Sequence, residues 1–135
     1  MNHLSQMGIQ LNGGDSVRAE ESLLQAWEAL PPPRDEWDFG QLVIQQAIGF
    51  YLKTNRPAEA QQWLDPLASS FGSKDDGTVA MISGTVYYEV GDFHAAFERF
   101  DFLHEQFGKR PFQGRDKKYL NFYLDESKKR GSSKK

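Results

Sequence analysis

The chain has 135 residues, of which 39% are apolar and none is cysteine, and its net charge is −3. We expect one compact soluble domain whose core needs no disulfide, and thiol nucleophiles, zinc fingers and iron–sulfur clusters are excluded because cysteine is absent. The apolar runs are too short to cross a bilayer. Residues 1–11 lack the basic start and apolar stretch of a signal peptide, so we expect a cytoplasmic protein.

Charge is distributed unevenly along the chain. Residues 1–113 carry eight Lys or Arg and sixteen Asp or Glu, a net charge of −8, whereas residues 114–135 carry eight and three, a net charge of +5. An acidic body repels phosphate backbones, so nucleic acid is not an expected ligand. Residues 131–135 are expected to form a basic flexible tail. Contact of this tail with nucleic acid or an anionic membrane is the alternative.

Helix-breaking residues divide the chain into segments of helical length. The breakers, in chain order, are Asn12-Gly13-Gly14, Pro31-Pro32-Pro33, Asn55-Arg56-Pro57, Gly72, Gly91, Gly108 and Gly131. Apolar stripes at helical spacing lie between them: Ala19, Leu23, Ala26 and Leu30; Ala60, Leu64 and Leu67; Ala96, Phe100, Leu103 and Phe107. No alternation typical of strands competes with these stripes, so the sequence predicts an all-α protein.

The three stripes keep a constant distance from the breakers. Each opening alanine follows, by five residues, a breaker that can adopt the left-handed conformation ending a helix: Gly14, Asn55 and Gly91. Tyr51 and Tyr87 precede the second and third of these turns by four residues. Gly84 precedes Tyr87 by three residues, and its missing side chain predicts a close approach of two helices. Ala96 is expected where those helices cross.

In this phase the chain resembles the tetratricopeptide repeat family, whose unit of about 34 residues is a helix–turn–helix. The resemblance covers three divergent units, residues 1–33, 36–73 and 75–110, and a capping helix over 114–129. The third unit matches best, through Gly84, Tyr87, Gly91, Ala96, Phe100 and Leu103. The chain departs from the family in its longer alanine-to-alanine spacings of 41 and 36 residues, and in Ile48 and Gln10, which stand where a small and an aromatic residue are usual.

The resemblance implies a single domain, residues 1–130, built as a right-handed superhelical array of three helix–turn–helix hairpins with a C-terminal capping helix. The first helix of each hairpin would line a concave groove that binds a partner protein. The expected groove residues are Gln45, Gly49, Leu52 and Lys53; Met81, Thr85, Tyr88 and Glu89; and Leu4, Gly8 and Leu11. Tyr88 is the expected anchor, because a tyrosine buries much area at small entropic cost.

The basic clamp with which some members of this family hold acidic chaperone tails is missing. The corresponding positions hold Gln45, Gly49, Met81 and Thr85. A mixed polar and apolar lining favours a protein segment as the ligand, and the acidic body favours a basic partner.

A row of ionisable residues in the third unit could indicate a different chemistry. His94, Glu98, Asp101 and Glu105 share one helix face, as a metal site or an acid–base pair would require. Because the opposite face carries the apolar stripe, we expect this row to point to solvent. We therefore expect no catalytic residue, no metal ligand and no cofactor.

Three tryptophans lie near the predicted helix ends. Trp37 fits one face of a helix with Gly40 and Ile44, which predicts core packing, and anchoring of an interface is the alternative. Trp27 and Trp63 are expected to pack between neighbouring hairpins.

The sequence thus predicts a non-enzymatic scaffold that binds and occludes or neutralises a partner protein. One form is a bacterial immunity protein that inhibits a cationic toxin. The alternatives are a secretion-type chaperone or adaptor that cradles an effector segment, and a metal- or ligand-binding enzyme that uses the ionisable row. The sequence leaves the partner and the oligomeric state open.

Overall fold

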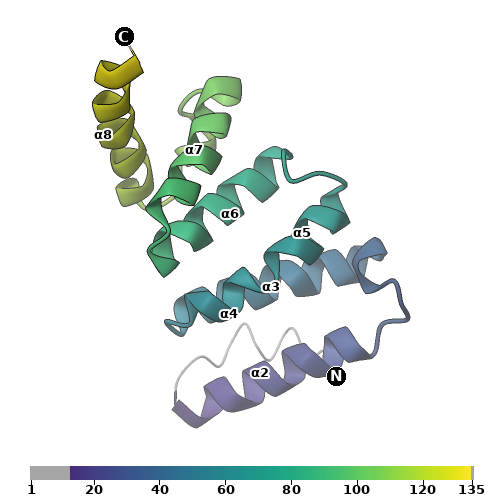
Figure 1. Ribbon diagram of the computed structural model, residues 1–135. Helices are drawn as coiled ribbons and strands as arrows, with labels where there is room; N and C mark the ends of the chain where they lie inside the picture. Colours follow the sequence, from purple (N-terminus) through teal and green to yellow (C-terminus); the bar gives the residue numbers. More distant parts are fainter. Residues whose placement is uncertain (1–12, 135) are drawn as a thin grey trace. The chain divides into compact units, whose positions relative to one another are not determined.

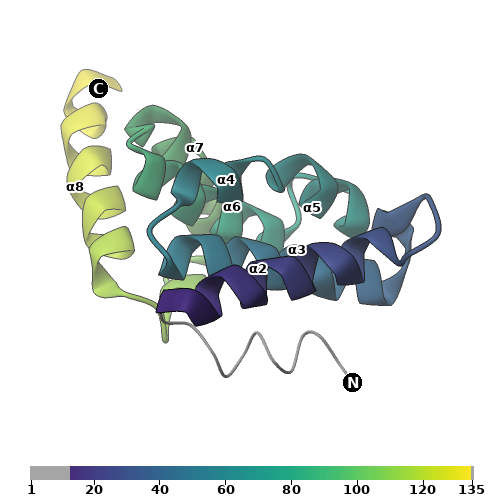
Figure 2. The same cartoon turned by 90° about the horizontal axis from the view of Figure 1, so that it is seen from below.

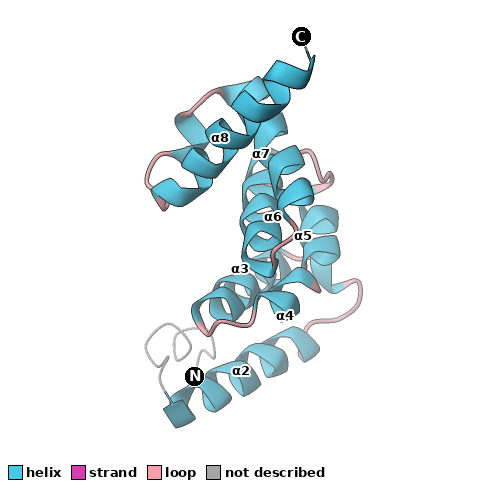
Figure 3. Ribbon diagram, turned by 60° about the vertical axis from the view of Figure 1, so that its left-hand side comes forward, coloured by secondary structure: helices cyan, strands magenta, loops and turns pink. Residues whose placement is uncertain are grey.

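The computed structural model describes the backbone of residues 13–134 and the side chains of residues 16–131. Within that range every regular element is a helix, as Figure 3 shows, so the all-α prediction is confirmed there. Leu4, Gly8 and Leu11, predicted for the groove, lie outside the described residues. No helix between residues 13 and 134 is both long and apolar enough to span a bilayer.

The chain forms two compact units, Met1–Lys74 and Asp75–Lys135. The first unit contains α2 (Gly13–Glu28), the short 3-10 helix η1 (Arg34–Glu36), α3 (Asp38–Lys53), α4 (Pro57–Gln61) and α5 (Leu64–Phe71). The second contains α6 (Gly77–Val90), α7 (Phe93–Phe107), the 3-10 helix η2 (Arg110–Phe112) and α8 (Lys117–Lys134). The boundary between the units falls between the second and third predicted repeats.

In the first unit, α3 is the central helix. Helix α2 packs along it, and α4 and α5 pack against it as well (Figures 1 and 2). The stripes predicted from helical spacing supply the core, since Leu23, Ile44 and Leu67 are fully buried. Burial of side chains of this size stabilises a fold by about 1.5–3 kcal/mol each.

The helix that carries Ala60, Leu64 and Leu67 is broken in two. Helix α4 ends at Gln61, and α5 begins at Leu64. Pro66 has no N–H, and in a continuous helix its ring would collide with the carbonyl four residues earlier, at Gln62. The break therefore falls one turn before this proline.

In the second unit, α6 and α7 form an antiparallel hairpin, and α8 packs against α7 (Figure 1). A β-carbon added to Gly84 would lie 2.5 Å from Cε1 of Phe100, which confirms the predicted close approach of the two helices. Ala96 and Leu103 are fully buried in the same core. Phe107, the last residue of this stripe, is 53% exposed.

The turns after α3 and α6 have the same geometry. Asn55 and Gly91 adopt left-handed φ values of 61° and 90°, and the carbonyls of Tyr51 and Tyr87 accept hydrogen bonds from the amides of residues 56 and 92. These are the contacts of a left-handed helix C-terminus, repeated after 36 residues as the sequence phase predicts. The prediction for Gly14 is wrong, because Gly14 lies inside α2.

Helix α8 is longer than the capping helix predicted over 114–129. It runs from Lys117 to Lys134, so the backbone of residues 131–134 continues the helix where a flexible tail was predicted.

Candidate functional site

The groove residues predicted in the third repeat include two that partners cannot reach. Met81 is 1% exposed and lies in the core of the second unit. Thr85 is also buried, and its hydroxyl donates a hydrogen bond to the carbonyl of Met81 at 2.9 Å. The expectation that Met81 and Thr85 line an open surface is therefore wrong.

Tyr88 and Glu89, on the same helix, are occupied by contacts with α8. The ring of Tyr88 makes edge-to-face contacts with Tyr119 and Phe122, at centroid distances of 5.4 and 5.2 Å. The Glu89 carboxylate accepts a hydrogen bond from the Tyr119 hydroxyl at 2.7 Å and forms an ion pair with Lys118 at 2.9 Å. The face of α6 predicted to hold a partner thus holds the chain's own last helix.

The electrostatics of this contact indicate a structural role. Burial raises the pKa of Glu89, but the hydrogen bonds from Lys118 and Tyr119 outweigh it, so the pKa is lowered overall. Burial and the bond to Glu89 raise the pKa of Tyr119. At neutral pH the Glu89 carboxylate is therefore charged and the Tyr119 hydroxyl keeps its proton. In these states the hydroxyl donates to the carboxylate, and this hydrogen bond helps to hold α8 against α6.

The groove residues predicted in the second repeat remain at the surface of α3. Lys53 is exposed, and Gln45, Gly49 and Leu52 are half-buried. A β-carbon added to Gly49 would meet no atom of the described residues within 4 Å, so those residues leave the surface beside it open. Two exposed apolar side chains, Phe39 and Leu42, begin the same helix and continue this surface.

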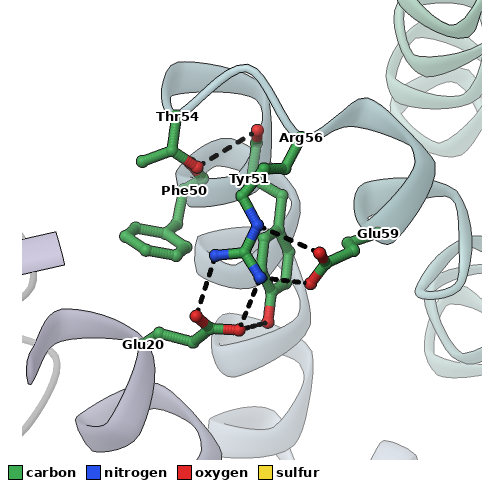
Figure 4. A network of polar contacts seen from close by, with 6 residues as sticks. All are labelled: Glu20, Phe50, Tyr51, Thr54, Arg56 and Glu59. Atoms are coloured by element: carbon green, nitrogen blue, oxygen red, sulfur yellow. Dashed lines mark hydrogen bonds and ion pairs between the residues drawn. The ribbon is translucent and has the colours of Figure 1, made fainter. Parts of the chain in front are cut away.

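A polar network that the sequence did not reveal joins α2, α3 and α4 (Figure 4). Arg56 binds Glu20 through Nη1 and Nη2, at 2.8 and 3.1 Å, and binds Glu59 through Nε and Nη2. The Tyr51 hydroxyl donates to Glu20 at 2.9 Å. Hydrogen bonding from Arg56, together with that from Tyr51, lowers the pKa of Glu20. The network ties the middle of α2 to the turn between α3 and α4. Glu20 is more than thirty residues from Tyr51 and Arg56 in sequence, so no local pattern shows its part in it.

The ionisable row of α7 is only partly solvated. His94, Glu98 and Glu105 are exposed. Nε2 of His94 lies 3.6 Å from Oε1 of Glu98. Asp101 instead accepts a hydrogen bond from the Tyr123 hydroxyl at 2.8 Å, and burial together with this bond raises the pKa of Tyr123 to about 12. Among the described residues, no three His, Asp or Glu side chains are placed to hold a metal ion.

The tryptophans divide between core and surface. Trp27 and Trp63 are in edge-to-face contact at 5.2 Å. Trp37 is 49% exposed, so the core prediction for it is wrong. It stands one residue before α3 with extended backbone, and its Nε1 donates to the Pro31 carbonyl at 2.8 Å. This bond turns the indole toward the proline run rather than toward the core.

Beside that proline run, the first unit has a cleft of about 460 Å³, which we call the acidic cleft. It is lined by Trp27, Pro32, Pro33, Arg34, Asp35, Asp65, Pro66 and Ser69. Arg34 is tied to the Trp27 carbonyl and to Glu28. In the described part of the chain, the carboxylates of Asp35 and Asp65 have no hydrogen-bond or ion-pair partner. Two available anions therefore border a wall of tryptophan and proline.

The chain matches no protein-family model, no curated protein and no solved structure. The resemblance to tetratricopeptide repeats thus depends on the phased residues and on the repeated turn after α3 and α6.

Proposed function

We propose that the protein is a non-enzymatic scaffold that binds a basic segment of a partner protein in the acidic cleft. The observation that carries this proposal is a pair of carboxylates, Asp35 and Asp65, that lie beside an apolar wall and have no hydrogen-bond or ion-pair partner among the described residues. Other carboxylates form ion pairs within the fold: Glu20 pairs with Arg56, and Glu89 pairs with Lys118. A free surface with both charge and apolar area is the kind that recognises a ligand.

The chemistry of the cleft selects a cationic side chain with an apolar neighbour. Carboxylates form their strongest hydrogen bonds with guanidinium and ammonium groups. The rings of Trp27, Pro32 and Pro66 are rigid, so an apolar group that packs on them costs little side-chain entropy. An arginine or lysine next to a bulky apolar residue satisfies both parts of the cleft.

The charge of the first unit supports a basic partner. Residues 1–74 carry five Lys or Arg and nine Asp or Glu, a net charge of −4, whereas residues 75–135 carry eleven and ten. The acidity of the chain is therefore concentrated in the unit that contains the acidic cleft. Complementary charge speeds the encounter with a basic protein and disfavours acidic ones.

The repeated turn supports a helical-repeat architecture for this scaffold. Tyr51, Asn55 and Ala60 correspond to Tyr87, Gly91 and Ala96 after 36 residues, in conformation as well as in type. This repetition favours a right-handed superhelix of three tetratricopeptide-like hairpins capped by α8. A cytoplasmic location remains the expectation from the sequence. Such arrays act by holding other proteins rather than by chemistry.

Within this class, we favour an inhibitor that occludes a cationic enzyme, of the kind found among bacterial immunity proteins. A secretion-type chaperone or adaptor is the second candidate. The exposed side chains of Phe39 and Leu42, followed on α3 by the open surface at Gly49, favour it, because an extended effector segment could lie along such a helix.

Selection from a random peptide library tests the proposal without a known partner. We expect the wild-type protein to select peptides with Arg or Lys beside Leu, Phe or Trp. The variant Asp35→Asn/Asp65→Asn should lose these peptides, because it keeps the shape of both side chains and removes their charge. The control Glu21→Gln/Glu36→Gln removes two exposed carboxylates that do not line the cleft. This control should still bind the basic peptides that the wild-type protein selects. A wild-type pool without basic peptides, or one that both variants retain equally, would contradict the proposal.

A further inference from the structure

The second unit has a cleft of opposite charge, which we call the basic cleft. Its volume is about 310 Å³, and it is lined by Gly77, Thr78, Met81, Leu103, Phe107, Arg110, Pro111 and Arg115. The residues come from the start of α6, the end of α7, η2 and the turn before α8, all within Asp75–Lys135. Met81 and Leu103 are buried beneath the cleft, and Phe107 and Pro111 supply its accessible apolar surface. Arginine is the only charged residue type among the lining residues.

The two arginines of this cleft differ from the others of the chain. The sequence has seven arginines, and five of them interact with other groups of the protein. Arg110 and Arg115 are the exceptions: in the part of the chain that the structure describes, neither guanidinium has a hydrogen-bond or ion-pair partner. Both side chains are exposed. Two planar, permanently charged donors are thus available at the border of an apolar surface.

The accessible apolar surface of the cleft is mainly the ring of Phe107. This ring lies beside the start of α6, since a β-carbon on Gly77 would be in ordinary van der Waals contact with its Cε2, at 3.4 Å. The ring remains 53% exposed. The nearby carboxylate of Asp76 accepts hydrogen bonds from the amides of Thr78 and Val79 at the start of α6, and Asp76 is not among the residues that line the cleft.

We propose that the basic cleft is a second binding site, which takes a protein segment with acidic residues beside one bulky apolar side chain. The arginines bind the carboxylates in the bidentate geometry that guanidinium favours. The apolar side chain packs on Phe107 and Pro111. The site is separate from the acidic cleft and binds the opposite charge.

The size and openness of the cleft favour a peptide over a small molecule. Pockets for small ligands have volumes of about 300–1,000 Å³ and bury most of the ligand. The basic cleft is at the lower end of this range and opens to solvent. One inserted side chain with its neighbours spread over the border fits such a surface, and an enclosed metabolite does not.

The same random peptide library, presented to three forms of the full chain, tests this inference. We expect the wild-type pool to include peptides with Asp or Glu beside Phe, Leu or Trp. In Arg110→Gln/Arg115→Gln, the affinity for these peptides should fall about tenfold or more. In Lys109→Gln/Lys117→Gln, which removes the same charge from exposed residues outside the cleft lining, the affinity should change less than about threefold.

Amide chemical shifts then locate the bound peptide. The selected acidic peptide should shift the amides of Gly77, Thr78, Arg110 and Arg115 in the wild-type protein. Asp35→Asn/Asp65→Asn should bind it as tightly as wild type does, so failure of the acidic cleft and failure of this site are distinguishable. The inference is overturned if no acidic–apolar peptide is selected or if the arginine variant binds it equally. The inference is also overturned if inorganic phosphate binds as tightly as the selected peptide does. The same holds if the peptide keeps its affinity when its apolar residue is replaced by serine.

Discussion

Replacing Gly84 with alanine should destabilise the second unit, because the crossing of α6 and α7 leaves no room for a methyl group. The added β-carbon would lie 2.5 and 2.7 Å from Cε1 and Cδ1 of Phe100, where carbon atoms at optimal separation are about 3.5–4 Å apart. Phe100 is fully buried, so its ring cannot move toward solvent. Overpacking of this kind costs about 1–3 kcal/mol, and the better helix propensity of alanine returns about 0.8–1 kcal/mol. We expect a net loss of up to about 2 kcal/mol in the free energy of unfolding.

Gly49 provides the matched control, since it also lies inside a helix but is not crowded by any described residue. Because a β-carbon there would meet no atom of the described residues within 4 Å, only the propensity gain remains, and Gly49→Ala should stabilise the protein by up to about 1 kcal/mol. Urea unfolding followed by far-ultraviolet circular dichroism measures both variants. Equal stabilities for Gly84→Ala and Gly49→Ala would refute the packing that we assign to Gly84 and Phe100.

Three further predictions concern single side chains. Asp101→Ala should lower the free energy of unfolding by about 1 kcal/mol through loss of the Tyr123 bond, whereas Glu98→Ala should change it by less than about 0.5 kcal/mol; urea titrations in parallel would show whether the two differ. Glu20→Gln should cost about 1 kcal/mol at neutral pH. The pKa of Glu20 is lowered in the fold, so its carboxylate contributes to stability above the usual carboxyl pKa of about 4.5. This contribution is lost as the pH falls through the lower pKa of the folded state. The melting temperatures of the variant and the wild type should therefore converge in acid. Ala96→Leu should cost about 1–3 kcal/mol by overpacking a fully buried site, and an unchanged melting temperature would be inconsistent with that site.

Local signals in the sequence predicted the helical class, most of the buried faces and two of the three left-handed turns. Helical spacing identified the buried faces around Leu23, Leu67 and Phe100, and Asn55 and Gly91 ended helices where the backbone becomes left-handed. These features depend on residues within one or two turns of each other, which a single sequence displays directly. The break at Gln62–Trp63 was not predicted, although Pro66 is the local signal that could have indicated it.

The predicted groove of the third repeat failed because it assumed that one face of α6 is free. Val79, Ala80, Met81 and Val86 are all buried, and a helix that is apolar on every side is a buried helix. The aromatic residues Tyr119 and Phe122 signalled that α8 needs a partner surface. Which surface it covers depends on contacts over some 30 residues, and helical periodicity carries no information about them.

The acidic cleft was beyond sequence reasoning for a similar reason. Asp35 and Asp65 are thirty residues apart, and only the packing of η1 against α5 brings their segments together. The run of three prolines predicted only that a helix ends there, and it did not indicate which helix the following segment would face.

The affinity of one selected basic peptide for the wild-type protein and for Asp35→Asn/Asp65→Asn, measured by isothermal titration calorimetry, tests the proposed function most directly. Each carboxylate at such a surface contributes about 0.5–1 kcal/mol. We therefore expect the double variant to bind about five- to thirtyfold more weakly, and Glu21→Gln/Glu36→Gln to bind as wild type does. Raising the salt concentration should weaken peptide binding to the wild-type protein. It should also reduce the difference in affinity between wild type and Asp35→Asn/Asp65→Asn. Equal affinities for wild type and the Asp35→Asn/Asp65→Asn variant at low salt would contradict a protein-binding site in the acidic cleft.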